Sequence, residues 1–325
     1  MGTIVKGFFR ELTRVIGIII GSLVGLVLIV TLANLSITAI ERQRFPPPGR
    51  FVEVGGRRMH VFTVGNGTRN VVLLSGLGTA SPVTDFAPLI NALKPDFTVT
   101  VVECFGYGWS DWTNQPRTNQ NVVGEVRLAL REAGVLPPYI VVPHSLSGIY
   151  TLYWINIHPE EISAVVALDM TVPAQLKYIH PTGLYTLVGV ARALGVVRLA
   201  LLVDPGLAAY NVPAYSEEQR QTVRRMASWN YLNKTVTNES YWASSNLREV
   251  QGFKFPDPIP ISMILSKDSA QQLGKFMPGM DWVKAHQDLV AGNSKAKIYL
   301  VDGGHNVHWL NSEMIAEVVR ETVAR

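Results

Sequence analysis

The sequence is poor in cysteine and in unbalanced charge. Cys104 is the only cysteine among 325 residues. A single thiol excludes an intrachain disulfide and any zinc site built from several cysteines. Cys104 also ends an apolar run, which indicates packing rather than a nucleophilic role. Charged residues make up only 17% of the chain, and the net charge is +4 at pH 7.

All of the positive excess lies at the N-terminal end. Residues 1–50 contain six basic and two acidic residues, so residues 51–325 are neutral overall. A neutral body with a few basic residues near the N-terminus gives no reason to expect nucleic-acid binding. We therefore expect no nucleic-acid partner.

Charge is missing altogether from Val15 to Ile40. Its most apolar part, Val15–Ala33, would span about 28 Å as a helix, which matches one bilayer core. A removable signal peptide is the alternative, but the run is long and lacks a clear small-x-small cleavage motif. We therefore predict an N-terminal segment, residues 1–45, with a retained single-pass transmembrane helix at about residues 15–37.

The flanks of this span say little about orientation, because three basic residues precede it and three follow it. The membrane side stays open, with an extracytoplasmic catalytic domain favoured. Gly17, Gly21 and Gly25 share one helix face, and such small residues permit close helix packing in a homodimer. Glycine is also simply common in membrane helices, which is the plainer explanation.

The prolines at 46–48 end the helix and mark the start of a second unit, residues 46–325. This unit alternates apolar strand-like runs with helical patterns such as Asn119–Ala133 and Ser312–Ala324, the latter with Ser312 as N-cap. The near-continuous apolar character of the runs predicts a mostly parallel sheet covered on both faces by helices, an α/β fold. The predicted strands are Phe51–Val54, Met59–Val64, Asn70–Leu74, Thr98–Cys104, Tyr139–Val142, Ile162–Leu168, Ile259–Leu265 and Ala296–Val301.

One long interval breaks this alternation. It separates the strand ending near Asp169 from the strand beginning at Ile259, and it contains helical patterns over Leu184–Leu202 and Ser216–Leu232. An insertion at the carboxyl edge of a parallel sheet is well placed to cover a site there. We predict a helical cap, or lid, over about residues 171–256.

The sharpest local motif is Tyr-Ile-Val-Val-Pro-His-Ser-Leu-Ser-Gly, residues 139–148. A serine between an apolar strand and a helix-compatible run fits a nucleophile turn, whose consensus is G-x-S-x-G. Ser145 is the predicted nucleophile, and the N–H of Leu146 is a predicted oxyanion donor. Pro143 and Ser147 replace the two glycines of the consensus. Ser147 is small enough to fit the turn. Pro143 is tolerable if the strand has already lost its hydrogen-bonded partner strand at that residue. A buried turn serine is the alternative reading.

A second oxyanion donor is expected from Leu-Leu-Ser-Gly-Leu-Gly, residues 73–78, where a strand enters a glycine-containing loop. We assign it to the N–H of Leu77. A phosphate-binding loop is the alternative, but the P-loop lysine is missing and the glycines lack dinucleotide spacing.

The predicted general base is His305, which follows a strand and two glycines in Asp-Gly-Gly-His-Asn-Val-His, residues 302–308. His308, three residues later, is its competitor. His144 adjoins the serine, but its side chain should point away from the serine hydroxyl. These three histidines therefore differ in expected role although they lie close to the same motifs.

The predicted acid is Asp268, just beyond the strand at 259–265, where a carboxylate could orient the imidazole. The order Ser145, Asp268, His305 is one of the chain orders in which a Ser-Asp-His triad occurs. Asp169, also at a strand end, is the alternative acid.

Taken together, Pro-His-Ser-Leu-Ser-Gly, Ser-Gly-Leu-Gly, Phe-Gly-Tyr-Gly-Trp-Ser-Asp (105–111) and Gly-Gly-His-Asn-Val-His resemble the α/β-hydrolase superfamily, most nearly bacterial capped hydrolases with an N-terminal membrane helix. The resemblance covers about residues 51–325. It implies the α/β-hydrolase fold, Ser145, His305 and Asp268 as the triad, and Leu77 and Leu146 as oxyanion donors. A serine nucleophile argues against epoxide hydrolase or haloalkane dehalogenase chemistry, which needs an aspartate there.

The expected function is a serine hydrolase that cleaves an ester or thioester of an apolar small molecule near a membrane. A C–C bond hydrolase, a peptidase and an acyltransferase on the same triad stay open, as does a non-catalytic receptor or scaffold that retains the fold. Trp109 and Trp112 are expected to line the pocket, although packing of cap against core also explains them. No cofactor and no metal are expected.

Overall fold

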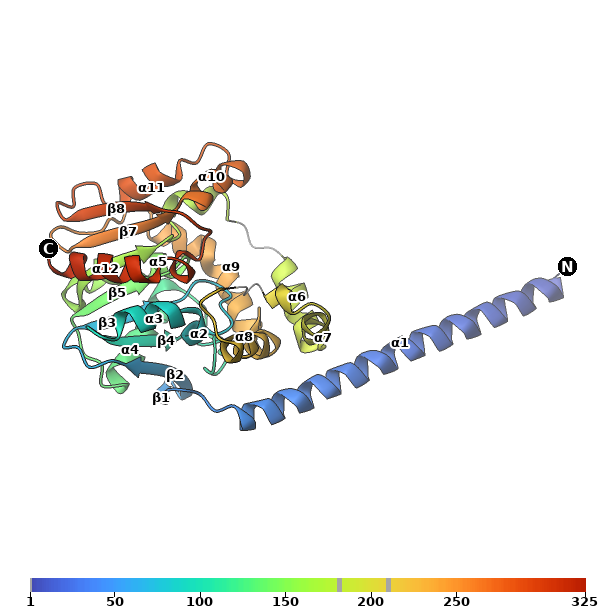
Figure 1. Ribbon diagram of the computed structural model, residues 1–325. Coiled ribbons are helices and arrows are strands. Elements are labelled where there is room, and N and C mark those ends of the chain that lie inside the picture. The colour runs from blue at the N-terminus through green and yellow to red at the C-terminus, as the bar shows by residue number, and fades with distance from the viewer. Residues whose placement is uncertain (1, 180–182, 209–211) are drawn as a thin grey trace.

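A computed structural model describes residues 2–179, 183–208 and 212–325. Within these ranges the chain forms an eight-stranded sheet of order β1-β2-β4-β3-β5-β6-β7-β8 (Figure 1). Strand β2 is antiparallel to β1 and β4, and the other neighbours are parallel. The strands are β1 Arg50–Val54, β2 Arg57–Val64, β3 Asn70–Leu74, β4 Thr98–Glu103, β5 Tyr139–Pro143, β6 Ile162–Leu168, β7 Ile261–Ser266 and β8 Ala296–Val301.

The predicted strands are confirmed, most of them to within one or two residues. Strand β7 begins at Ile261, two residues later than expected, because Pro260 has no N–H for the ladder. The mostly parallel sheet is confirmed too, and its strands are rich in β-branched residues that suit a pleated surface buried on both sides.

Helices cover both faces of the sheet. One face packs against α4 and α5, and the other against α3 and α12. Successive residues of β3 show the alternation, since Val72 and Leu74 join the first cluster while Val71 and Leu73 join the second. The helices of the body are α2 Pro82–Asp85, α3 Ala87–Leu93, α4 Asn119–Glu132, α5 Ser147–Ile157, α10 Lys267–Phe276, α11 Trp282–Leu289 and α12 Ser312–Val323. The N-cap position of helix α12 is Asn311, one residue before the predicted cap Ser312, and its side chain makes no capping hydrogen bond.

Between β6 and β7 the described residues form four helices that we call the cap helices: α6 Gly183–Ala193, α7 Val196–Val203, α8 Glu217–Asn230 and α9 Lys234–Glu249. The 3₁₀ turns η2 Pro173–Lys177 and η3 Pro205–Ala208 accompany them. The helical stretch predicted for Leu184–Leu202 is two helices, because the chain bends by 81° at Gly195, whose φ of +85° suits glycine. Residues 180–182 and 209–211 of the predicted cap lie outside the described residues.

The first helix, α1 Gly2–Arg44, projects away from the body (Figure 1). It ends just before the prolines at 46–48, as expected. The chain thus has one long, apolar N-terminal helix, and the most apolar 18-residue window within Lys6–Arg44 is not buried against the body. Side chains added at Gly17, Gly21 or Gly25 would meet no described atom within 4 Å, so homodimerisation through this face stays a prediction.

Candidate active site

Ser145 occupies a tight turn between β5 and α5. Its φ of +53° is unusual for a residue with a side chain and is typical of a nucleophile turn. The N–H of His144 donates to Leu74 O at 2.9 Å, and the N–H of Ser145 donates to Leu168 O at 3.1 Å. These two bonds tie the turn to both neighbouring strands and hold the Ser145 hydroxyl at the carboxyl edge of the sheet.

The structure explains how the turn tolerates its two departures from the consensus. The Ser147 hydroxyl accepts the His144 N–H at 2.9 Å and lies 2.8 Å from the Leu74 carbonyl, so it fastens the turn to β3. Pro143 pairs with Leu74 of β3, but it falls in a gap in the pairing with β6, which stops at Val141 with Val165 and resumes as a bridge between His144 and Leu168. The residue without an N–H thus lies where β5 is not paired with β6.

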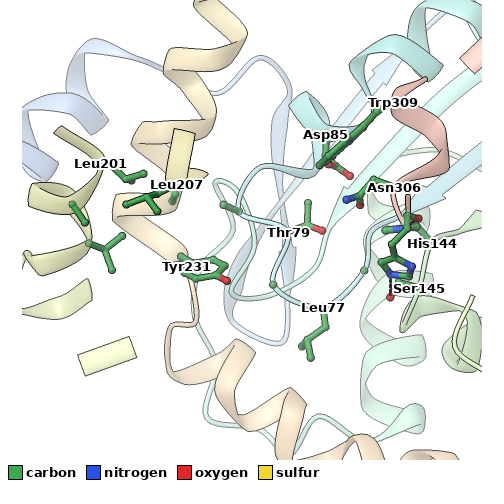
Figure 2. Close-up of a pocket in the computed structure, with 17 residues that line it drawn as sticks. Leu77, Thr79, Asp85, His144, Ser145, Leu201, Leu207, Tyr231, Asn306 and Trp309 are labelled. Carbon is green, nitrogen blue, oxygen red and sulfur yellow. Dashed lines mark hydrogen bonds between the residues drawn. The ribbon is translucent and has the colours of Figure 1, made fainter. Parts of the chain in front are cut away.

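Two side chains complete a hydrogen-bonded row with Ser145. His305 follows β8, and its Nε2 lies 2.8 Å from Ser145 Oγ (Figure 2). Its Nδ1 lies 2.7 Å from Oδ2 of Asp169, the residue directly after β6. Segments far apart in sequence thus bring a hydroxyl, an imidazole and a carboxylate together at one edge of the sheet.

The carboxylate in this row belongs to Asp169, which contradicts the prediction that Asp268 orients the His305 imidazole. Asp268 lies in the first turn of α10 and is exposed. Strand β7 passes directly into that helix, since the Ser266 hydroxyl accepts the Ser269 N–H and caps it. The helix therefore turns the Asp268 carboxylate toward solvent instead of toward His305.

The neighbours of Asp268 hold Asp169 in place. The buried Asp169 carboxylate accepts hydrogen bonds from the Ser266 N–H at 3.0 Å and the Ser269 hydroxyl at 2.5 Å. Trp282 Nε1 donates to the same carboxylate at 3.2 Å. With His305, four donors replace its lost hydration, which a buried carboxylate requires. The strand end that suggested Asp268 thus supplies donors for the acid on the adjacent strand.

The two predicted oxyanion donors lie on either side of the nucleophile. Leu77 lines the pocket, and Leu146 follows Ser145 at the start of α5. Within the described residues no hydrogen bond occupies the N–H of either. Gly76 lets the loop approach, because a Cβ there would lie 2.8 Å from Ser145 Cβ and 3.3 Å from Oγ. The role of the Leu77 and Leu146 N–H groups as oxyanion donors stays a prediction.

The other two histidines take different positions. His308, the rival base, is buried with Nε2 2.9 Å from Asp85 Oδ2. His144 Nε2 lies 3.1 Å from the carbonyl oxygen of His305, and its Nδ1 has no partner among the described residues. Burial, together with His305 and His308, holds the pKa of His144 well below its ordinary value of 6.5. A neutral His144 adds no positive charge beside His305.

Asp85, His144 and His308 also offer three possible ligand atoms within 4.8 Å of one another. These three buried ligand atoms are close enough together to contact one metal ion. The geometry does not test the expectation that the protein needs no metal or cofactor.

A cavity of about 410 Å³ opens in front of Ser145. The loop after β3 and the residues after β8 form one side, and the cap helices form the other (Figure 2). Most of the cap residues on its wall are apolar: Val197, Ala200, Leu201, Leu207, Ala227 and Tyr231. The volume lies within the range of sites for small molecules.

The tryptophans expected in this wall lie elsewhere. Trp109 packs edge-on against Trp229 with ring centroids 5.2 Å apart, and Trp112 lies beneath the Arg192 guanidinium. Both join the cap to the body, which is the alternative that the sequence left open. The sequence did not predict that Leu201, Leu207 and Trp309 line the cavity. For Leu201, the available signal was the nearly all-apolar pattern of Val196–Val203.

Comparisons with known proteins agree with this architecture. No family model matches the chain. The uncharacterized protein YbdG of Bacillus subtilis (strain 168) is 26% identical over 327 residues, covering 96% of this chain and 98% of that protein. An epoxide hydrolase of Vigna radiata has a similar structure, with a TM-score of 0.60 at 18% identity over 85% of this chain and 97% of its own. An enol-lactonase of Burkholderia xenovorans LB400 has a TM-score of 0.59 at 18% identity, over 85% of this chain and 100% of its own.

The chain has the α/β-hydrolase fold. At these identities the likeness shows the fold alone, because proteins of one fold perform different reactions. The α/β-hydrolase fold accounts for the Ser145 turn between β5 and α5 and for a histidine after the last strand. The reaction has to be argued from the side chains at the site.

Proposed function

We propose that this chain is a membrane-anchored serine hydrolase that cleaves an ester or thioester of an apolar molecule through an acyl-enzyme. The supporting observation is the unbroken row of hydrogen bonds from Ser145 Oγ through His305 to Asp169. A hydroxyl bonded to an imidazole, itself oriented by a buried carboxylate, is the arrangement that activates serine for acyl transfer.

The reaction follows from these positions. His305 Nε2 takes the Oγ proton while Oγ bonds to the substrate carbonyl carbon. The displaced electron pair moves to the carbonyl oxygen, which the N–H groups of Leu77 and Leu146 stabilise. As the intermediate collapses, the proton passes from His305 to the leaving oxygen or sulfur, and the acyl group stays on Ser145. Water, losing a proton to His305, then releases the acid, and that proton returns to Ser145 Oγ.

Asp169 keeps the imidazole in the productive tautomer. With its carboxylate 2.7 Å from Nδ1, the ring proton stays on Nδ1 and Nε2 is free to accept the Ser145 proton. The carboxylate also stabilises the positive charge that His305 gains in the transition state. These two effects are the reason to name Asp169 as the triad acid.

An apolar acyl group suits the cavity. Leucine, valine and alanine side chains of the cap face Ser145, so an apolar chain would gain free energy by leaving water there. A serine at the turn favours ester chemistry over that of epoxide hydrolases, which need an aspartate. One structural neighbour is an enol-lactonase, and a lactone is a cyclic ester.

Membrane attachment is supported by α1. Its apolar stretch is long enough for one bilayer core and is not buried against the body. A cleaved signal sequence would share these features, so we test retention directly. The mass of the purified membrane-bound protein should include residues 1–45, and a chain that begins after Ala33 would contradict an anchor.

A fluorophosphonate probe tests the nucleophile. It should label the wild type and leave Ser145→Ala unlabelled, while Ser163→Ala, which removes an exposed hydroxyl on β6, keeps full labelling. Equal labelling of the wild type and Ser145→Ala would refute the assignment.

Turnover separates an enzyme from a non-catalytic relative. The purified full chain should hydrolyse p-nitrophenyl esters, and His305→Ala should abolish that activity. A panel of acyl lengths and leaving groups, including amides and acceptor alcohols, then separates ester hydrolysis from peptidase, C–C hydrolase or acyltransferase reactions. No turnover of any ester by the labelled protein would favour a receptor or scaffold.

A further inference from the structure

Helix α7 is apolar on both of its sides. Its sequence, Val-Val-Arg-Leu-Ala-Leu-Leu-Val, contains one polar residue. Val197, Ala200 and Leu201 face the pocket, whereas Leu202 and Val203 are 74% and 89% exposed. A helix with so little polar surface is expected in a protein core or in lipid, yet the described protein leaves Leu202 and Val203 of this one largely uncovered.

Helix α6 continues the exposed apolar surface. Leu184, Leu187 and Val190 recur at the spacing of one helix face and are 61%, 68% and 50% exposed. The two helices together are apolar enough for a membrane segment, although they meet at 81°. We call the exposed apolar side chains of α6 and α7 the cap apolar face. Scattered exposed leucines need no explanation, but several on two adjoining helices do.

Helices α6 and α7 lie beside the C-terminal part of α1 (Figure 1). Thr31, Asn34, Thr38 and Glu41 form a polar stripe on α1, and the Arg198 guanidinium meets three of them. It pairs with both Glu41 carboxylate oxygens at 2.8 and 2.9 Å and donates to Asn34 Oδ1 at 2.8 Å and Thr38 Oγ1 at 2.9 Å. The one charged residue of α7 therefore joins the cap to α1.

The turn between α6 and α7 closes this junction. A Cβ at Gly195 would lie 2.9 Å from Asn34 Cβ and 3.1 Å from Val30 Cγ1, so only glycine permits the approach. Asn34 Nδ2 lies 3.4 Å from Arg192 O. These contacts fix where the cap apolar face lies along the axis of α1, which is beside residues 30–41.

This position along α1 corresponds to a membrane surface when α1 spans a bilayer. From Val15, where the uncharged stretch begins, to Asn34 an α-helix rises about 28 Å, which is close to one bilayer core. Asn34 would then lie at the edge of the hydrocarbon, with Glu41 and Arg198 in the headgroup region. The exposed leucines of α6 and α7 would meet the same layer.

We propose that the cap apolar face inserts into the bilayer surface where α1 leaves it, so that the pocket receives acylated amphiphiles from the lipid. This inference rests on the proposed membrane anchor and deepens the proposed substrate class. Helix α7 has lipid on one side and the wall of the cavity on the other. An acyl chain passing from the membrane to Ser145 would stay on apolar surface and avoid the cost of entering water.

Depth-dependent quenching tests the insertion without any use of catalysis. In a Cys104→Ser background, cysteines at Leu187 and Leu202 are labelled with nitrobenzoxadiazole, and the full chain is reconstituted into phosphatidylcholine–phosphatidylglycerol vesicles. Ala291→Cys is the control, because Ala291 is exposed and precedes β8 at the opposite edge of the sheet. Lipids with a shallow doxyl group should quench the two cap probes and leave the control probe unchanged.

Cap probes as insensitive to doxyl lipids as the Ala291 probe would overturn the proposal. Blue-shifted emission without quenching would also overturn it, and would indicate a second copy of the chain on this face. Quenching is independent of hydrolysis, so a protein that inserts but turns over no ester would refute the proposed function alone.

A matched pair of variants tests the delivery of substrate. Leu187→Gln/Leu202→Gln should lower kcat/KM on a long-chain ester held in vesicles about tenfold and change hydrolysis of a soluble short ester by no more than about twofold. The control Leu136→Gln/Ile157→Gln changes two exposed apolar residues of the body and should affect neither. Equal losses on both substrates, or no loss on the vesicle ester, would contradict entry from the lipid.

Discussion

The Nδ1 atom of His305 lies 2.7 Å from a carboxylate oxygen of Asp169, which is fully buried at the end of β6. Asp268 lies one strand away along the sheet edge, exposed on the first turn of α10. The two aspartates follow adjacent parallel strands, so they offer a direct test of which carboxylate orients the imidazole.

Asp169→Asn should lower kcat by about 10³-fold or more, because an amide would favour the wrong tautomer of His305. Asp268→Asn should leave kcat within about twofold. The measurement is ester hydrolysis by both purified variants, with circular dichroism to check folding. Comparable losses in the two variants would show that the row of hydrogen bonds does not govern the reaction.

The sequence predicted the sheet well because the body's strands are short apolar runs bounded by turn residues, and that signal is local. Ser145 and His305 were also found locally, each from the few residues around a strand end. Choosing between Asp169 and Asp268 was not a local question. Both follow strands, and the choice depends on Ser266 capping α10 and thereby turning one carboxylate outward while donating to the other.

Two further features were out of reach for a similar reason. Trp109 and Trp112 follow a strand that leads toward the site, but packing against Trp229 and Arg192 draws them under the cap. The bend at Gly195 splits a continuous helical pattern, because the turn must pass close to Asn34 of α1. Contacts between distant segments decide both, and hydrophobic periodicity does not report such contacts.

Gly76→Ala should reduce kcat/KM by about 100-fold or more, since its new methyl group would lie 2.8 Å from Ser145 Cβ and crowd the oxyanion site. Gly124→Ala is the matched control. Gly124 is inside α4 with no atom within 4 Å of its would-be Cβ, so alanine there should stabilise the protein by about 0.5–1 kcal/mol. Ester kinetics and thermal melts of the two variants check both statements; normal kinetics in Gly76→Ala would refute the close approach.

Ser147→Ala should destabilise the protein by about 0.5–1.5 kcal/mol, because it removes a buried hydroxyl that accepts the His144 N–H at 2.9 Å and lies 2.8 Å from the Leu74 carbonyl. The His144 N–H keeps its second acceptor, Leu74 O. Ser163→Ala removes a hydroxyl that donates to Tyr139 O at 3.1 Å from an exposed position, and should cost less than about 0.5 kcal/mol. Denaturation of the full chain in detergent micelles measures both. A harmless Ser147→Ala would mean that the hydroxyl does not fasten the turn.

Stability should fall as the pH drops below about 6.5, in part because of His144. Burial and the two neighbouring histidines lower its pKa in the folded chain, so below pH 6.5 the unfolded chain takes up a proton that the folded chain does not. One such proton costs about 1.4 kcal/mol of stability for each pH unit until the folded-state pKa is reached. His144→Gln should therefore flatten the dependence of the unfolding free energy on pH between 6.5 and 5. His286, whose pKa burial also lowers, contributes equally in both proteins and cancels in the comparison. Parallel curves for the two proteins would show that His144 is protonated as readily in the folded state as in the unfolded one.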